Sequence, residues 1–571
     1  MNAQSKNASS HWRGPLFALA LSLVLAAAAP SRIAAQQTAP QAAQQVAPKA
    51  APAAKPVAQG CTLPSGEPHD EDKAPTRITS EQARQLFALV DVLLKFSSDE
   101  TGLPIKSTVK RQLTTRDDVV KYLDEKFNED EGTKRLERDE IVLKKFGLLD
   151  HDFNLKPFLL QLLKEQIEAY YDSKTKTVNL LDWIGPDDEQ PVLAHELTHA
   201  LQDQHSDLEK WDNQTPDDVS TDSAGDRDHL ARDEMDTARD SVAEGQATVV
   251  MWDCVLKPLG KSLIHDPEVL DLLKSQMSGV EDSPVMARAP LLISESMLFP
   301  YREGMSFEQD LWMDQGQSAA FAGALDRPPT SSWEIINPRE YERKHIPAIP
   351  LLPDIHPLTD PAYKPYDIGQ VGQLDVQILS KLLGGDNSAR DLTPAWNGGL
   401  YWAGQLRSAT TPAQQADTAS IALFYLSVWR NADSANVFAK IYSNSLGRKY
   451  SRVSELSSGA SAAEDGSVER LFTTNEGPVL ITTRGNMLFV AESFPLPLAR
   501  KLTALILDAQ GAGPMHLADT PLRLGAPSLH TLPATMPDAP GGALTGDLVH
   551  FFAEAGVMKA AVDAERLTIQ K

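Results

Sequence analysis

The chain has 571 residues and a formal net charge of −24 at pH 7, a length that allows two or three domains with sizeable cores. The acidic surplus argues against nucleic acid or an anionic membrane surface as the main partner. Cys61 and Cys254 are the only two cysteines, which excludes a disulfide-rich scaffold.

The first 35 residues have the pattern of a secretory signal peptide. Arg13 supplies a positive charge, and residues 16–29 are apolar but too short for a comfortable membrane span. Residues 33–35 then offer a cleavage site before Gln36. We therefore expect export to the periplasm or the extracellular space, without stable membrane insertion after cleavage. A retained N-terminal anchor is the alternative.

Three further patterns precede the central motif. Residues 36–60 are rich in Ala, Pro and Gln, which predicts a linker with little to bury. The chain is then mostly helical and charged, with helices predicted to begin at Thr79 and Thr115, and we expect a helical cover. Residues 167–182 change to a period of two around Asp172-Ser173-Lys174, which predicts a β-hairpin.

The most informative stretch is residues 191–205, PVLAHELTHALQDQH. His195, Glu196 and His199 form an H-E-x-x-H motif within it. On a helix, two His four positions apart lie on one face and can reach a single ion. Zn²⁺ suits such a site, and Glu196 can take a proton from a water at the metal. Apolar flanking residues argue against a solvated surface helix.

The third ligand has two candidates. His205 has the spacing of a metzincin, but that pattern needs a Gly at the position that Gln202 occupies, because the helix must break there. On an unbroken helix His205 points about 80° away from His195. Glu244, on a second predicted helix over residues 231–252, lies among small residues that would allow close approach. We favour Glu244, with Asp240 placed to hydrogen-bond the ligands.

Other acidic residues and one histidine near the second helix are weaker candidates. Glu234, Asp236 and Asp240 lie in a polar part of the helix that we expect to be exposed, so they should be poorer metal ligands than Glu244. His229 lies in an Asp-rich stretch and is expected to be a surface residue.

The residues VLAHELTHALQDQ resemble the active-site helix of the thermolysin-type gluzincins. The resemblance implies His195 and His199 as ligands, Glu196 as general base, and Glu244 as third ligand by role only, after a long insertion. The motif is also similar to that of a group of secreted bacterial proteins that pair HELTHALQDQ with a later E-G-x-A-T. In zincins the sheet edge beside this helix binds the substrate backbone as an added strand. Tyr170 and Tyr171 could line that cleft or simply pack in the core.

Gluzincins also use a Tyr or His donor to stabilise the oxyanion. Tyr301, next to Arg302, is the best candidate for that role. Tyr341, His345 and His229 follow it.

The two cysteines leave three alternatives open. In an exported protein Cys61 and Cys254 could form a disulfide that ties the linker to the helix of Glu244. They could instead stay free thiols, or Cys61 could block the zinc in a latent form.

A Pro-rich stretch, residues 351–365, is the predicted boundary to a smaller α+β domain over residues 366–571. Strands are expected at residues 400–408 and 421–429, a helix at 433–442, and a hairpin at 479–492. A helix follows at residues 495–508, and another ends the chain at residues 544–567.

Together these patterns predict an α+β fold, with a mostly helical, zincin-like domain over residues 61–350 that contains a small sheet. The predicted function is a secreted zinc metallopeptidase acting on a peptide or protein, with zinc held by His195, His199 and Glu244 and with Glu196 and Tyr301 as catalytic residues. The alternatives are an inactive zincin-fold envelope binding protein, a site using His205, and a hydrolase of a non-peptide amide. Specificity and oligomeric state are not predicted.

Overall fold

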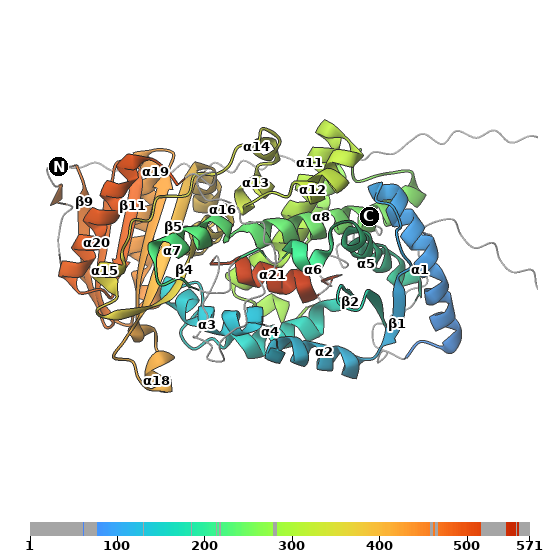
Figure 1. Ribbon diagram of the computed structural model, residues 1–571, viewed down its shortest axis with the longest axis horizontal. Helices are drawn as coiled ribbons and strands as arrows, with labels where there is room; N and C mark the ends of the chain where they lie inside the picture. Colours follow the sequence, from blue (N-terminus) through green and yellow to red (C-terminus); the bar gives the residue numbers. More distant parts are fainter. Residues whose placement is uncertain are drawn as a thin grey trace, which may run out of the picture. The chain divides into compact units, whose positions relative to one another are not determined.

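The computed structural model describes residues 61, 77–129, 131–183, 186–212, 214–215, 219–277, 283–456, 461–462, 466–515, 544–555 and 557–558. The described residues all belong to one compact unit (Figure 1). The predicted signal peptide and linker lie outside the described residues. Among the helices that are described, none has the length and apolar content needed to cross a membrane.

The N-terminal half of the described chain is mainly helical. Helix α1 (Ser80–Thr101) begins where predicted, because the Thr79 side chain and the Gln82 side chain each accept a hydrogen bond from the other's backbone N–H. Helix α2 (Arg116–Glu129) likewise follows Thr115, which exchanges hydrogen bonds with Asp118. Further helices here are α3 (Glu131–Phe146), α4 (Leu155–Gln166), α6 (Leu208–Asp212), α7 (Ser223–Arg232), α9 (Pro267–Gln276), α10 (Leu291–Phe299), α11 (Met305–Gln315), α12 (Ala324–Asp326), α13 (Ser332–Ile336) and α14 (Pro338–Glu342).

A small mixed sheet accompanies these helices, with strand order β1-β3-β2-β12. Strand β1 (Lys110–Thr114) is parallel to β3 (Thr177–Leu181), and β2 (Ile167–Asp172) is antiparallel to β3. The predicted hairpin is therefore confirmed. Its turn is closed by the Asp172 carboxylate, which accepts hydrogen bonds from the backbone N–H groups of Lys174 and Thr175.

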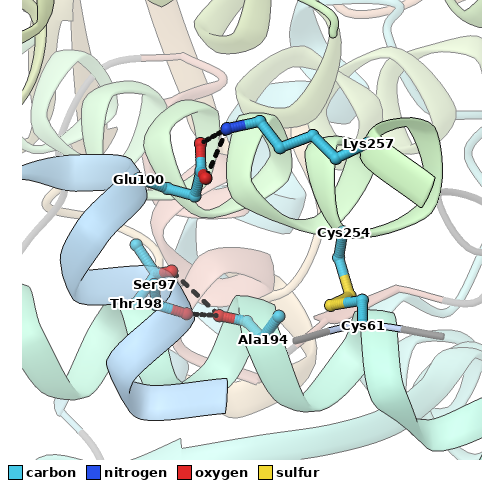
Figure 2. Close-up of a disulfide and its surroundings, with 7 residues drawn as sticks. All are labelled: Cys61, Ser97, Glu100, Ala194, Thr198, Cys254 and Lys257. Carbon is cyan, nitrogen blue, oxygen red and sulfur yellow. Dashed lines mark hydrogen bonds and ion pairs between the residues drawn. A yellow bond between two sulfur atoms is a disulfide. The ribbon is translucent and has the colours of Figure 1, made fainter. Parts of the chain in front are cut away.

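Two long helices form the centre of this part: α5 (Pro186–Ser206) and α8 (Met235–Leu256). Helix α5 packs against α8, α1 and β2. On its α1 side, the Ala194 carbonyl oxygen accepts hydrogen bonds from Ser97 Oγ at 3.0 Å and Thr198 Oγ1 at 2.8 Å (Figure 2). The Ser97 bond holds α1 against the turn that precedes His195, whereas the Thr198 bond lies within α5.

The Cys61–Cys254 disulfide is formed (Figure 2). It settles the alternatives left open by the sequence, because neither cysteine is free in the described chain. Cys254 lies near the end of α8, so the bond joins residue 61 to the helix that carries Glu244 across a sequence separation of 193. In the chain-entropy picture, closing so long a loop restricts the unfolded state strongly.

The C-terminal half is built on an antiparallel sheet. Its strands, in spatial order, are β4 (Tyr363–Gln370), β5 (Trp396–Leu406), β6 (Ile421–Trp429), β11 (Met487–Glu492), β10 (Gly477–Arg484), β9 (Val468–Thr474) and β7 (Val453–Glu455), and β8 (Ser461–Ala462) pairs with β9. The helices of this half are α15 (His356–Thr359), α16 (Gln373–Gly384), α17 (Asp386–Leu392), α18 (Pro412–Gln415), α19 (Ala432–Lys449) and α20 (Leu496–Ala509).

Side chains alternate between the two faces of this sheet. Tyr401 and Tyr425 belong to the hydrophobic core that continues into the helical half. Trp402 and Phe424 face a second core together with Ile506 of α20. The mixed α/β class agrees with the predicted α+β fold, and the hairpin at residues 479–492 is confirmed by β10 and β11. The boundary at residues 351–365 stays a prediction.

The last predicted helix is wrong in extent. Helix α21 (Gly546–Ala555) is followed by strand β12 (Val557–Met558) rather than by further helix. Strand β12 pairs antiparallel with β2, from the other end of the sequence. Residues past 558 lie outside the described part of the chain. The helical pattern did not continue because β2 offers backbone partners that no local pattern reveals.

The acidic residues around the start of α8 were expected to be exposed, and this prediction is wrong. Glu234, Asp236 and Asp240 are all buried, because α13 and α21 pack against α8 and Gly372, just before α16, lies against Glu234. Glu234 accepts a hydrogen bond from Ser332 Oγ at 2.6 Å. Burial, and next the neighbouring Asp375, raise the pKa of Glu234 from its ordinary value of 4.5 to about 8.

Glu234→Gln is expected to stabilise the protein at pH 8 and to flatten its pH dependence. Between about pH 4.5 and 8 the unfolded chain ionises Glu234 while the folded protein keeps it protonated, so wild-type stability falls as pH rises. The gain at pH 8 should be on the order of a few kcal/mol. Denaturant unfolding at pH 5 and pH 8 measures it, with the exposed Glu268→Gln as control. Equal pH slopes in wild type and Glu234→Gln would contradict this assignment.

Candidate metal centre

Helix α5 places the two histidines of the motif on one face. The His195 and His199 Nε2 atoms are 3.0 Å apart and the ring centroids are separated by 4.7 Å. Both residues are buried, and so is Glu196 between them. The apolar flanks of the motif, including Leu193, Leu197 and Leu201, are fully buried. The predicted burial of this helix is therefore confirmed.

Glu244 of α8 completes the group. Its Oε2 lies 3.1 Å from His195 Nε2, and its Oε1 lies 3.5 Å from His199 Nε2. One ligand atom from each of the three residues lies within 4.8 Å of the others. Tetrahedral ligands at bond lengths of about 2.0–2.1 Å would be about 3.3 Å apart. The three side chains therefore fit a metal ion, whose identity the geometry does not specify.

His205 is not part of this group. Its Nε2 lies 3.0 Å from Asp326 Oδ1, at the edge of α12. Helix α5 runs unbroken through Gln202 to Ser206, so the last turn carries His205 away from the other two histidines. The structure brings Glu244 to the cluster and leaves His205 on another face.

The charges within the cluster stabilise one another. Burial alone would raise the pKa of Glu244, but the charge on His199 and hydrogen bonds from both histidines lower it to about 2. Burial alone would also lower the pKa of His199, yet the Glu244 carboxylate raises it to about 9. For His195, burial outweighs the carboxylate and lowers the pKa. Glu244 as carboxylate and His195 as neutral imidazole are the forms that ligate a metal.

Gln202 fixes the orientation of His199 through the ring nitrogen that faces away from the cluster. Its Oε1 lies 2.8 Å from His199 Nδ1, and its Nε2 donates to the Ala243 carbonyl oxygen and to Gln246 Oε1, each at 2.9 Å. In a neutral His199, whose Nδ1–H is donated to Gln202, the lone pair is on Nε2, the nitrogen that faces the cluster. From the sequence, Gln202 is notable only for standing where a metzincin has Gly. Its spacing of three residues from His199 was the available signal for this role.

A hydrogen bond from Asp240 to one of the metal ligands stays a prediction. Asp240 is bonded to His550 of α21, whose Nδ1 lies 3.1 Å from Asp240 Oδ2. His550 is a site residue that the sequence reasoning missed, since the two residues are 310 positions apart and no local pattern connects them.

Tyr301 lies beside the cluster, in a π-helical turn, η3 (Pro300–Gly304). Its ring centroid is 6.2 Å from that of His195. Gly304 and Gly245 allow this approach: a Cβ on Gly245 would meet the Gly304 carbonyl carbon at 2.4 Å. Gly245, next to Glu244, therefore allows α8 to contact η3 closely, in addition to the predicted approach to α5.

Burial, followed by the negative charges of Glu244 and Glu196, holds the pKa of Tyr301 well above its ordinary value. A hydrogen bond between the Tyr301 side chain and Glu244 adds to this shift. Tyr301 therefore remains protonated at neutral pH and can donate a hydrogen bond.

The other candidate donors have different partners. Tyr341 donates its hydroxyl to the Arg327 carbonyl oxygen at 2.6 Å. His345 is largely exposed and pairs with Glu340. Arg302 pairs with Glu295. His229 was expected at the surface, and that prediction is wrong: it is buried, with Nε2 at 3.3 Å from Asp233 Oδ1, because α7 packs against β4.

The two tyrosines of β2 have different surroundings. Tyr170 stacks on Tyr122 with ring centroids 4.3 Å apart, which agrees with ordinary packing. Tyr171 donates its hydroxyl to Asp203 Oδ2 at 2.8 Å and lines a surface hollow beside the last turn of α5 together with Lys106 and Lys176.

Comparison with models of protein families, with curated proteins and with solved structures found no match to this chain. The likeness to the gluzincins therefore rests on the residues themselves. The structure itself shows a mixed α/β protein. It contains a buried group of two histidines and one glutamate that could hold a metal ion.

Proposed function

We propose that this protein is an exported zinc-dependent metallopeptidase of the gluzincin type. The observation that carries the proposal is the convergence of His195, His199 and Glu244 around one point, with Glu196 on the same turn of α5. Two imidazole nitrogens and one carboxylate oxygen are a ligand set used by catalytic zinc in peptidases. The Cys61–Cys254 disulfide supports export, because disulfides persist in oxidising compartments.

A zinc ion held by these three residues would polarise the scissile carbonyl and lower the pKa of a water ligand toward neutrality. Glu196, as a carboxylate, would accept the proton of the attacking water and pass it to the leaving amine. The Tyr301 hydroxyl, protonated at neutral pH, would donate a hydrogen bond to the oxygen on which negative charge develops. Gln202 would keep His199 in one tautomer and orientation throughout.

A second candidate is a zinc-stabilised binding module without hydrolytic activity. One observation favours it: the side chains of His195, Glu196 and Tyr301 are 0% exposed within the described part of the chain. A structural zinc site is typically closed, whereas a catalytic one keeps a position for water.

Metal removal tests the proposed function. We expect purified protein from Gln36 to Lys571 to digest an unstructured protein, to lose this activity on treatment with a chelator, and to regain it with about one equivalent of Zn²⁺. Mg²⁺ or Ca²⁺ should not restore it, because both prefer all-oxygen sites. Tight zinc binding without digestion of any protein would instead favour the binding module.

A further inference from the structure

A late segment of the chain, residues 544–555 together with 557–558, packs against the elements that form the metal centre. We call it the cover segment. Helix α21 contacts α8, which carries Glu244, and α10, which leads into the turn of Tyr301. Its apolar residues Leu548, Val549 and Phe552 are fully or almost fully buried, within the same core as the flanks of α5. The cover segment is thereby built into the hydrophobic core of the helical half.

The cover segment also occupies an edge of the small sheet. Val557 and Met558 of β12 pair antiparallel with Ala169 and Ile167 of β2. Without β12, the order β1-β3-β2 would leave β2 as the edge strand, and β2 packs against α5. An edge strand beside a metal-binding helix is where an extended peptide can add its backbone to a sheet. Here the chain places its own backbone on that edge, and β12 also contacts α5.

A polar contact fastens the cover segment on its other side. His550 Nδ1 lies 3.1 Å from Asp240 Oδ2, and Asp240 is one helical turn before Glu244. His550 and Asp240 are both buried. At the start of α21, Thr545 hydrogen-bonds Asp375 of α16. The segment is therefore held at its beginning, its middle and its end.

We propose that the cover segment is an internal occupant of the peptide-binding edge, which closes the metal centre until it is displaced. This inference rests on the proposed function. It accounts for a catalytic set that is 0–9% exposed in a protein otherwise equipped for hydrolysis. An extended peptide would take the place of β12 along β2, antiparallel to it, once α21 and β12 have moved away from α8 and β2.

A reversible cross-link tests the proposal. In Ala169→Cys/Val557→Cys, a disulfide between paired strand positions would lock β12 onto β2. Two rates are measured in the oxidised and the reduced protein: transfer of bound zinc to a chelator, and digestion of an unstructured protein. Wild type and Ala169→Cys, treated with the same reductant, control for reduction of the Cys61–Cys254 bond.

We expect the oxidised double variant to transfer zinc and to digest protein at least about tenfold more slowly than its reduced form, because only the open population exchanges. Equal rates of zinc transfer and of digestion in the oxidised and reduced forms would overturn the proposal, since the cover segment would then not block access to the metal centre. If oxidation slows zinc transfer but neither form digests protein, the result supports the cover segment and contradicts the proposed peptidase function. The zinc measurement therefore separates the two ideas.

A second pair of variants covers the case in which the double variant does not fold. His550→Asp puts a carboxylate against Asp240, whereas His550→Asn is similar in shape and uncharged. At pH 8, His550→Asp should transfer zinc faster than His550→Asn by about tenfold. Identical transfer rates for the two variants would contradict a cover that is fastened at Asp240.

Discussion

Glu244→Ala is expected to remove bound metal from the protein, whereas His205→Ala is expected to leave it in place. The Glu244 carboxylate lies within 3.5 Å of both histidine Nε2 atoms, while His205 is bonded to Asp326. Loss of a residue that only orients a ligand weakens metal binding by about 10–100-fold. Loss of Glu244 itself should cost at least as much.

The measurement is zinc content, by plasma emission spectroscopy, of the Gln36–Lys571 protein and of both variants after dialysis against a weak chelator. Circular dichroism checks that each variant is folded, because removing Glu244 leaves His195 and His199 facing each other in a buried site. Zinc retained by Glu244→Ala and lost from His205→Ala would move the third ligand to His205.

Glu196→Gln is expected to keep zinc but to digest protein about 10²–10⁴-fold more slowly. Glutamine has nearly the same shape as glutamate, so the fully buried position should tolerate it. Its amide cannot accept the proton of an attacking water, which removes general-base catalysis without removing a metal ligand. Because the expected loss is confined to the chemical step, zinc content should equal that of the wild type.

Digestion of an unstructured protein and zinc content are measured on the same preparation. Glu189→Gln is the matched control, since Glu189 is a buried carboxylate on the same helix but lies outside the His195–His199–Glu244 group. If Glu196→Gln digested protein as fast as the wild type, the assigned general base would be wrong. A loss of zinc in Glu196→Gln would show that Glu196 supports the site rather than the reaction.

The binding-module alternative makes the opposite prediction for this pair of experiments. A structural zinc site would lose zinc and stability in Glu244→Ala, but Glu196→Gln would change neither zinc content nor any activity. The two variants together therefore distinguish a peptidase from a module in which zinc only stabilises the fold.

Local sequence patterns determined the elements around the site. The capping residues of α1, the hairpin of β2 and β3, and the run of strand β6 follow from interactions within a few positions. The same holds for the motif on α5, because residues four apart on a helix must share a face. Such features depend on neighbours that the sequence itself places next to one another.

Only the tertiary structure decided which side chains from other elements lie next to the motif on α5. Glu244 is 49 residues from His195, and the packing of α8 on α5 brings Glu244, rather than His205, next to the two histidines. The turn of Tyr301 reaches the cluster through contact between Gly304 and Gly245. Glu234 and His229 look like surface residues in sequence, yet helices from other parts of the chain bury them.

The cover segment shows the same limit most clearly. Its apolar and charged pattern predicted one long helix, but residues 557 and 558 instead complete a sheet with residues 167 and 169. Helical periodicity is a property of adjacent residues, whereas strand pairing depends on whichever edge the fold leaves free. The sequence by itself thus determined which residues could perform chemistry, and long-range packing decided which of them meet and what covers them.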